Sequence, residues 1–320
     1  MSLTAEKHMV VRLPGSHSVS LGLQNGGLFV LKKIVVLLSF FVLMAAGTQQ
    51  TKAEAAAAGD RATWLWNPWM IIDDEAGTLA FLESKQLNKV YVQIDRDIPA
   101  GVYRSFIQKA AAKGMRIYAL DGAPAWVAPK GYTSQNQLMN WLGDYQSGST
   151  DDQKFAGVHL DVEPYLYSGW TSNQAGTIKA YQALVQRAKT STASLKLPLE
   201  VDMPFWFDEV RYKNTYGAGM LAEWVIANTN SVTIMAYRDD AAFIIDVVKN
   251  EIAMAGKYGK AIVVGVETGE TDEGDNISFF EEGEAFMQQE LAEVQSYYTG
   301  TPGFNGTAVH HVGSWMSMNP

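Results

Sequence analysis

The sequence predicts a single α/β domain with the (β/α)8 TIM barrel fold, and three observations support this prediction. Eight short apolar segments have the character of β-strands, and segments with helical spacing of apolar residues separate them. No glycine-rich phosphate turn follows the first strand, although an open doubly wound sheet, the main competing fold, would use one there. Residues 56–320 are also close in number to a typical barrel of about 250 residues.

The predicted strands are apolar at their centres and end at polar residues, glycine or proline. They lie at residues 63–67, 89–95, 116–121, within 155–165, and at 198–204, 231–237, 261–267 and 307–315. The predicted helices between them lie at residues 75–87, 99–113, 133–146, 173–189, 220–228, 241–258 and 279–298. This alternation implies right-handed crossovers and a parallel sheet that closes on itself, without a second domain.

The N-terminal segment has the parts of a secretory signal. Lys32 and Lys33 precede an apolar run at residues 34–46, and an Ala-x-Ala site ends at Ala55. The run is shorter than the about 20 residues of a membrane span, so we expect no membrane span after processing. We predict an extension and signal peptide at 1–55, with the signal at about 32–55, and an exported barrel at 56–320. Extracellular and cell-wall-associated locations both fit; an uncleaved anchor is the alternative.

Composition excludes several classes of function. The net charge of −9 and the lack of a Lys/Arg run in residues 56–320 argue against nucleic acid and anionic membranes as partners. The absence of cysteine excludes disulfides, thiol nucleophiles and thiolate metal sites. His310 and His311 are adjacent, so on a strand they face opposite ways and cannot chelate one metal. We predict neither a cofactor nor a metal; the sequence carries no signal for oligomeric state.

The predicted fourth strand separates an apolar face from a polar one. The even-numbered positions from Val158 onward are apolar, whereas His159, Asp161 and Glu163 share the opposite face. Pro164 cannot donate to a strand ladder, so it should end the strand and leave Glu163 at the C-terminal rim. A barrel has its active site at this rim.

Asp161 and Glu163 form the candidate catalytic pair. Two residues along a strand separate them by about 7 Å, with Asp161 deeper. Neighbouring buried acids raise each other's proton affinity, so Glu163 can remain protonated near neutrality and act as a general acid. The structural alternative is an Asp–Arg pair together with a Glu that caps the next helix.

Each predicted strand end offers a polar or aromatic residue to the same rim. Carboxylates and aromatic faces around one cleft suit a site that cleaves a sugar polymer, because acids act on the glycosidic oxygen and flat rings hold pyranoses. The residues at these ends are Trp66 or Asn67, Asp95, Asp121, Glu163, Asp202, Tyr237, Glu267 and Trp315.

The fourth strand resembles the signature D-G-x-D-x-D-x-E of glycoside hydrolase family 18, the chitinases and endo-β-N-acetylglucosaminidases. Gly157, Asp161 and Glu163 match this signature, and Ala156 and His159 replace its first two aspartates.

Two further segments resemble the same family. The segment Ile-Met-Ala-Tyr that ends at Tyr237 is similar to the family's sixth-strand motif M-x-Y-D, with Arg238 in place of the aspartate. Ser314 and Trp315 resemble the family's closing tryptophan on strand eight. The three similarities follow one another in the family's order along the barrel.

The resemblance implies substrate-assisted retaining hydrolysis of β-linked N-acetylglucosamine-containing glycans such as chitin, peptidoglycan or N-glycans. It implies that Glu163 protonates the leaving oxygen, Asp161 orients the attacking N-acetyl group, and Tyr237 binds the intermediate. Trp315 would form the floor under the −1 sugar, and we expect His159 to replace the missing aspartate as the partner of Asp161. The further predicted substrate contacts are Asp202, Glu267, Trp66, Asp121, Arg238 and His159.

Two alternatives use the same barrel. Glu163-Pro164 together with Glu267 resembles the retaining barrel glycosidases, in which an acid/base ends strand four and a nucleophile ends strand seven. Glu267 would then attack the sugar and no N-acetyl group would be needed, although Val162 stands where that motif has Asn. The other alternative is a non-catalytic carbohydrate-binding barrel, because the fold alone does not fix function.

Overall fold

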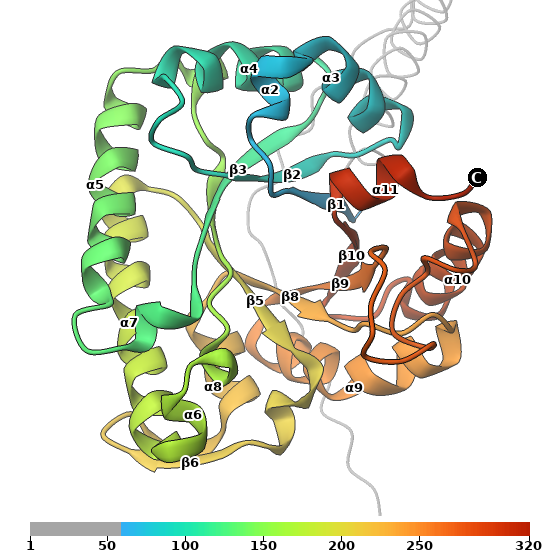
Figure 1. The fold of residues 1–320 in the computed structure, drawn as a ribbon. Coiled ribbons are helices and arrows are strands. Elements are labelled where there is room, and N and C mark those ends of the chain that lie inside the picture. The colour runs from blue at the N-terminus through green and yellow to red at the C-terminus, as the bar shows by residue number, and fades with distance from the viewer. Residues whose placement is uncertain (1–58) are drawn as a thin grey trace, which may run out of the picture. The chain divides into compact units, whose positions relative to one another are not determined.

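The computed structural model describes residues 59–320, so the predicted extension and signal peptide lie outside the described residues. The described chain forms a closed barrel of parallel strands in the order β1-β10-β9-β8-β5-β4-β3-β2, with helices around it (Figure 1). The predicted single-domain (β/α)8 barrel is confirmed. None of the helices in residues 59–320 is long and apolar enough to cross a membrane.

All eight predicted strands are present within the described residues. They are β1 (Asp60–Leu65), β2 (Lys89–Gln93), β3 (Arg116–Asp121), β4 (Gly157–Leu160), β5 (Leu199–Pro204), β8 (Ser231–Met235), β9 (Ala261–Glu267) and β10 (Phe304–His310). The predicted bounds of the last strand, 307–315, are wrong. His311 instead caps a short helix, because its ring nitrogen Nδ1 accepts the backbone N–H of Gly313 at 3.0 Å.

The helices surround the barrel, and all seven predicted ones are present. The helices of the described chain are α2 (Met70–Asp73), α3 (Glu75–Ser84), α4 (Ala100–Ala112), α5 (Tyr132–Ser147), α6 (Gly169–Ser172), α7 (Gln174–Leu195), α8 (Leu221–Asn228), α9 (Ala241–Tyr258), α10 (Glu284–Tyr298) and α11 (Val312–Ser317).

Local chemistry sets several of the helix boundaries. Asn173 caps α7 by accepting the N–H of Gly176, and Asp240 caps α9 through the N–H of Ala242. Gly259 ends α9 in the left-handed conformation, with φ of 61°. The structure also adds a hairpin of β6 (Arg211–Asn214) and β7 (Gly217–Met220) between β5 and α8, which the sequence analysis did not predict.

The barrel separates two buried layers, and β4 shows both. Val158 and Leu160 belong to the outer layer between strands and helices. His159 faces inward and stacks on Tyr91, an aromatic residue of the barrel interior, with ring centroids 3.7 Å apart. The predicted alternation of β4 is therefore confirmed, and it directs the polar face of the strand into the barrel.

A buried ion cluster closes the N-terminal end of the barrel. The Lys89 ammonium lies 2.5 Å from Asp60 Oδ2 and 2.8 Å from Glu200 Oε1, and all three residues are buried. Arg116 adds a contact of 2.6 Å to Asp60 from the partly exposed side. Both carboxylates depend on Lys89 for their counter-charge, so loss of this lysine should strongly destabilise the N-terminal end of the barrel.

We therefore expect Lys89→Ala to lower the free energy of unfolding by about 3–5 kcal/mol, because two buried carboxylates lose their main counter-charge. Chemical denaturation of both proteins measures the difference. Lys249→Ala is the matched control, since it removes only an exposed pair with Asp246 and should leave the midpoint unchanged. Equal midpoints for wild type and Lys89→Ala would contradict the assigned role of the cluster.

Candidate active site

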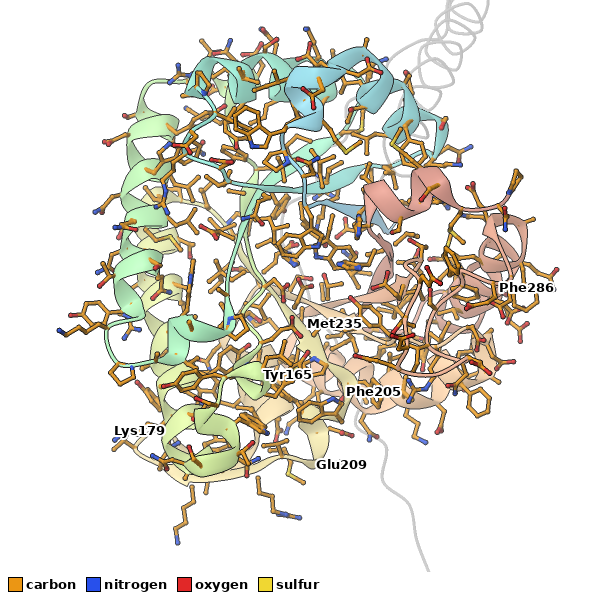
Figure 2. All side chains as sticks on the ribbon, in the orientation of Figure 1. Tyr165, Lys179, Phe205, Glu209, Met235 and Phe286 are labelled. Atoms are coloured by element: carbon orange, nitrogen blue, oxygen red, sulfur yellow. The ribbon has the colours of Figure 1, made fainter. Side chains whose placement is uncertain are left out.

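Glu163 lies three residues beyond Leu160, the last residue of β4, where Pro164 turns the chain into a short 3-10 helix. Burial raises the pKa of Glu163 to about 7, with a further contribution from the charge of Asp202. The hydroxyl of Tyr165 donates a hydrogen bond to Glu163 Oε2. Figure 2 labels Tyr165 near the middle of the view, together with Phe205, which directly follows β5, and Met235, the last residue of β8.

Asp161 lies one layer below Glu163 on the inner face. Burial, followed by the charges of Asp202 and Glu163, raises the pKa of Asp161 well above its usual range. Its Oδ1 atom is buried and has no hydrogen-bond partner among the described residues. The structure therefore places two acids with raised pKa values just after one strand, and perturbed carboxyls of this kind are frequent at functional sites.

His159 does not lie where the sequence analysis expected it. The side chain is fully buried, with Nε2 2.9 Å from Asp202 Oδ2 and Nδ1 3.8 Å from Glu200 Oε2. Burial alone would lower the pKa of His159, but these two carboxylates outweigh it and raise the pKa to about 9. The prediction of a substrate contact is wrong because the side chain is fully buried, and its close partner is Asp202 on the neighbouring strand β5 rather than Asp161.

Asp202 is likewise buried, at 4% exposure, instead of facing the rim. β5 continues for two residues beyond it to Pro204, so its side chain lies inside the barrel. The indole N–H of Trp64 donates to Asp202 Oδ2 at 3.0 Å. The predicted direct contact of Asp202 with substrate is therefore wrong, and this carboxylate acts on the mouth through its charge on Asp161 and Glu163.

Glu267 ends β9 and is held by three N–H donors. Its Oε1 accepts the backbone N–H groups of Thr268 and Gly269, each at 2.7 Å, and its Oε2 lies 2.6 Å from His310 Nδ1. Burial would raise the pKa of Glu267, but His310 and the backbone donors lower it. Glu267 is therefore an ionised carboxylate whose two oxygens are already engaged.

His310 at the end of β10 was missed as a site residue by the sequence analysis. Trp66 donates its indole N–H to His310 Nε2 at 2.8 Å. Because an indole nitrogen only donates, Nε2 accepts, and Nδ1 carries the proton that faces Glu267. The sequence did contain a signal for His310. Ala308 lines the barrel interior, and because strand side chains alternate between faces, the residue two positions later faces the same way.

Tyr237 completes this side of the mouth. Its ring centroid lies 5.9 Å from that of His310, and burial raises the pKa of Tyr237 well above its usual value. The phenol therefore remains a hydrogen-bond donor at neutral pH. Tyr237, Glu267 and His310 line a cavity of about 300 Å³ together with residues of the loop at 269–277.

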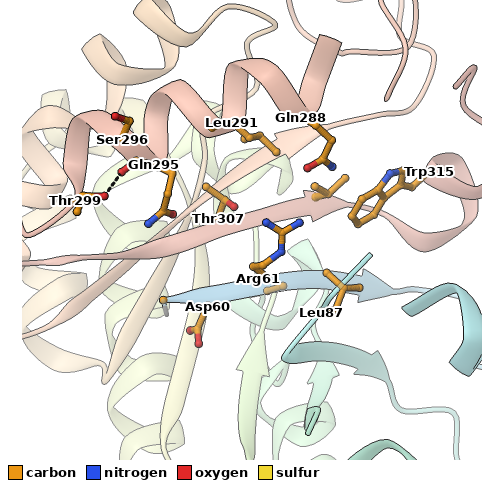
Figure 3. A pocket seen from close by; sticks show the side chains of 14 residues that line it. Asp60, Arg61, Leu87, Gln288, Leu291, Gln295, Ser296, Thr299, Thr307 and Trp315 are labelled. Atoms are coloured by element: carbon orange, nitrogen blue, oxygen red, sulfur yellow. Dashed lines mark hydrogen bonds between the residues drawn. The ribbon is translucent and has the colours of Figure 1, made fainter. Parts of the chain in front are cut away.

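Trp315 lies away from the mouth. It belongs to α11, is 2% exposed and packs edge to face on Phe81 with centroids 5.6 Å apart. Figure 3 shows it in a groove outside the barrel, near Leu87, Gln288 and Leu291. The prediction that Trp315 forms the sugar floor is wrong, because β10 ends at His310 and the chain then turns outward.

The remaining predicted contacts stay at strand ends. Asp121 ends β3, accepts the N–H of Gly122 at 2.8 Å, and has its pKa raised by burial. Arg238 donates to the carbonyl of Tyr237 at 2.6 Å, with its guanidinium 5.0 Å from the ring centre of Phe205. Among residues 59–320, no group of three or more His, Asp or Glu side chains could hold a metal ion.

The sequence matches no protein-family model and no curated protein. The fold is similar to that of a chitinase from Chromobacterium violaceum, with a TM-score of 0.50 and 12% identity over 81% of this chain and 97% of the chitinase. It is also similar to the spore cortex-lytic enzyme SleL of Bacillus megaterium, with a TM-score of 0.53 and 13% identity over 81% of this chain and 73% of SleL. At these identities the similarity establishes a shared fold.

The raised pKa of His159 predicts a pH-dependent contribution to stability. A pKa raised from 6.5 to about 9 stabilises the fold fully below pH 6.5, and this contribution is lost as pH rises through 9. We expect the difference in unfolding free energy between wild type and His159→Gln to shrink by up to about 3 kcal/mol over this window. Denaturant unfolding at pH 6, 7.5 and 9 measures it.

His311→Gln is the control for this series, because burial lowers the pKa of His311 and its difference should be flat above pH 6.5. A constant difference for His159→Gln from pH 6 to 9 would show that His159 is not charged in the fold.

Proposed function

We propose that the protein is a glycoside hydrolase that cleaves β-linked N-acetylglucosamine-containing glycans, with Glu163 as its general acid. The observation that carries this proposal is the position of Glu163 just after the C-terminal end of β4, with its pKa raised to about 7 and a second acid of raised pKa, Asp161, two residues before it. A carboxyl that titrates near neutrality suits protonation of a leaving oxygen. The barrel shared with a chitinase and a cortex-lytic enzyme supports the choice of substrate class.

The proposed mechanism is substrate-assisted and retaining. Glu163 protonates the glycosidic oxygen while the carbonyl oxygen of the substrate's N-acetyl group attacks the anomeric carbon. Because the Tyr165 hydroxyl binds Glu163 Oε2, the other oxygen, Oε1, is the one that carries the proton. Asp161 hydrogen-bonds the N-acetyl nitrogen and Tyr237 donates to its oxygen. Glu163 then deprotonates the water that opens the cyclic intermediate.

One observation favours the two-carboxylate alternative, in which Glu267 is the nucleophile. The pKa of Glu267 is lowered while that of Glu163 is raised, and such opposed shifts separate a nucleophile from an acid. Against it, three N–H groups already bind the two oxygens of Glu267, and this reduces its power to attack. We therefore propose the substrate-assisted mechanism as the first choice.

Export is also part of the proposal, and its support is the signal-like sequence that ends at Ala55. Chitin, peptidoglycan and N-glycans are the candidate substrates outside the cell. We expect exported material to begin near Ala56. N-terminal sequencing of protein from the culture medium tests this, and an intact N-terminus in the membrane fraction would contradict it.

Replacement of the proposed acid tests the activity itself. We expect Glu163→Gln to fold normally and to lower kcat about 10²- to 10⁴-fold, because glutamine keeps the volume and loses the transferable proton. Release of reducing ends from chitin, peptidoglycan and N-glycan substrates measures activity. Glu293→Gln, an exposed change on α10, is the matched control. Glycan binding without hydrolysis by the wild type would support the carbohydrate-binding alternative.

A second set of variants separates the two mechanisms. If the N-acetyl group attacks, Asp161→Asn and Tyr237→Phe should each lower kcat about 10²-fold or more, because both residues stabilise a species formed only along the reaction. Azide should not restore activity to Glu267→Ala. Azide rescue of that variant, with cleavage of glucose polymers lacking N-acetyl groups, would assign Glu267 as the nucleophile.

A further inference from the structure

A second groove lies beside the candidate active site, over the C-terminal ends of β1 and β2. Its volume is about 510 Å³, within the range typical of small-ligand sites, and Trp66, Trp69, Asp95, Arg96 and Asp97 line it. The groove is linked to the cavity lined by Tyr237, Glu267 and His310, because Trp66 in the groove is hydrogen-bonded at 2.8 Å to His310. A polymeric ligand bound in the cavity can therefore continue into the groove.

Trp69 in this groove is exposed and yet fixed in orientation. Its side chain is 42% exposed, although its indole N–H donates to Asp95 Oδ2 at 2.9 Å. Asp95 is held in turn, since its Oδ1 accepts the backbone N–H of Asp97 at 2.9 Å. A large aromatic face is thus presented to solvent with little remaining side-chain freedom, which lowers the entropy cost of stacking a ligand on it.

Trp66 is held in a comparable way. Its indole N–H is bound by His310, and His310 is oriented by Glu267, so this indole is tied to the end of β9. The groove therefore contains two indoles, each held through its N–H, from β1 and the turn after it. Trp315 is buried outside the barrel and adds no aromatic surface to this groove.

We propose that this groove is a distal subsite for another sugar ring of the same glycan, with Trp69 as its stacking platform and Asp95 as the residue that positions it. The apolar face of a pyranose matches the indole, and its hydroxyls match the carboxylate of Asp97. Two carboxylates against the single cation of Arg96 favour a neutral sugar over an anionic group. The subsite rests on the proposed function, because it assumes that the glycan crosses the mouth.

Calorimetric titration of the full chain carrying Glu163→Gln tests the subsite with the disaccharide and the hexasaccharide of N-acetylglucosamine as probes. We expect Trp69→Ala to weaken hexasaccharide binding about tenfold, the size expected from loss of one stacked aromatic contact. Tyr297→Ala is the control, because Tyr297 is a more exposed aromatic residue, at 64%, on α10. It should leave hexasaccharide affinity unchanged.

The role of Asp95 has its own readout. Asp95→Ala should weaken hexasaccharide binding in the parent and have no further effect in Trp69→Ala, because it acts through the indole. Hexasaccharide affinity that is unchanged by Trp69→Ala, in an enzyme that hydrolyses the polymer, would overturn the subsite and leave the function standing. A Trp69-dependent affinity in a protein that hydrolyses no glycan would support the subsite and reject the function. No binding of either probe would reject both.

Discussion

The contact between Asp202 and His159 is the interaction on which the candidate site depends. The two side chains meet at 2.9 Å inside the barrel, and neither has access to solvent that could replace the other. The charge of Asp202 contributes to the raised pKa values of both Asp161 and Glu163. A buried ion pair therefore holds in place the negative charge that favours protonated acids at the mouth, without occupying the mouth itself.

Charged groups are arranged in layers along the barrel axis. Lys89 contacts Asp60 and Glu200 at the floor, His159 pairs with Asp202 at mid-height, and Asp161, whose pKa is raised, directly follows β4 toward the mouth. The floor and the middle layer pair opposite charges, as the low dielectric of a barrel interior demands. Glu163, whose pKa is raised to about 7, is the acid at this end of the barrel that can exchange a proton near neutral pH.

The opposite wall of the mouth is rigid for a different reason. Trp66, His310 and Glu267 link β1, β10 and β9 through hydrogen bonds of 2.8 and 2.6 Å, and the backbone of the next loop completes the shell of Glu267. Both carboxylate oxygens of Glu267 are therefore occupied by structural hydrogen bonds. These bonds also fix an indole beside the cavity, so an aromatic contact for a sugar does not require the tryptophan of α11.

The sequence by itself determined the barrel, its eight strands and the inward direction of the polar face of β4 at His159. These features follow from local periods of two and 3.6 residues in the apolar pattern. Pro164 is also a local signal, because a proline affects the backbone next to it. Tertiary structure decided which side chains meet. His159 contacts Asp202 because β4 and β5 are neighbours, and Trp315 leaves the mouth because His311 starts a helix. Such contacts depend on register and ring direction across strands, and the one-dimensional pattern of a strand does not contain them.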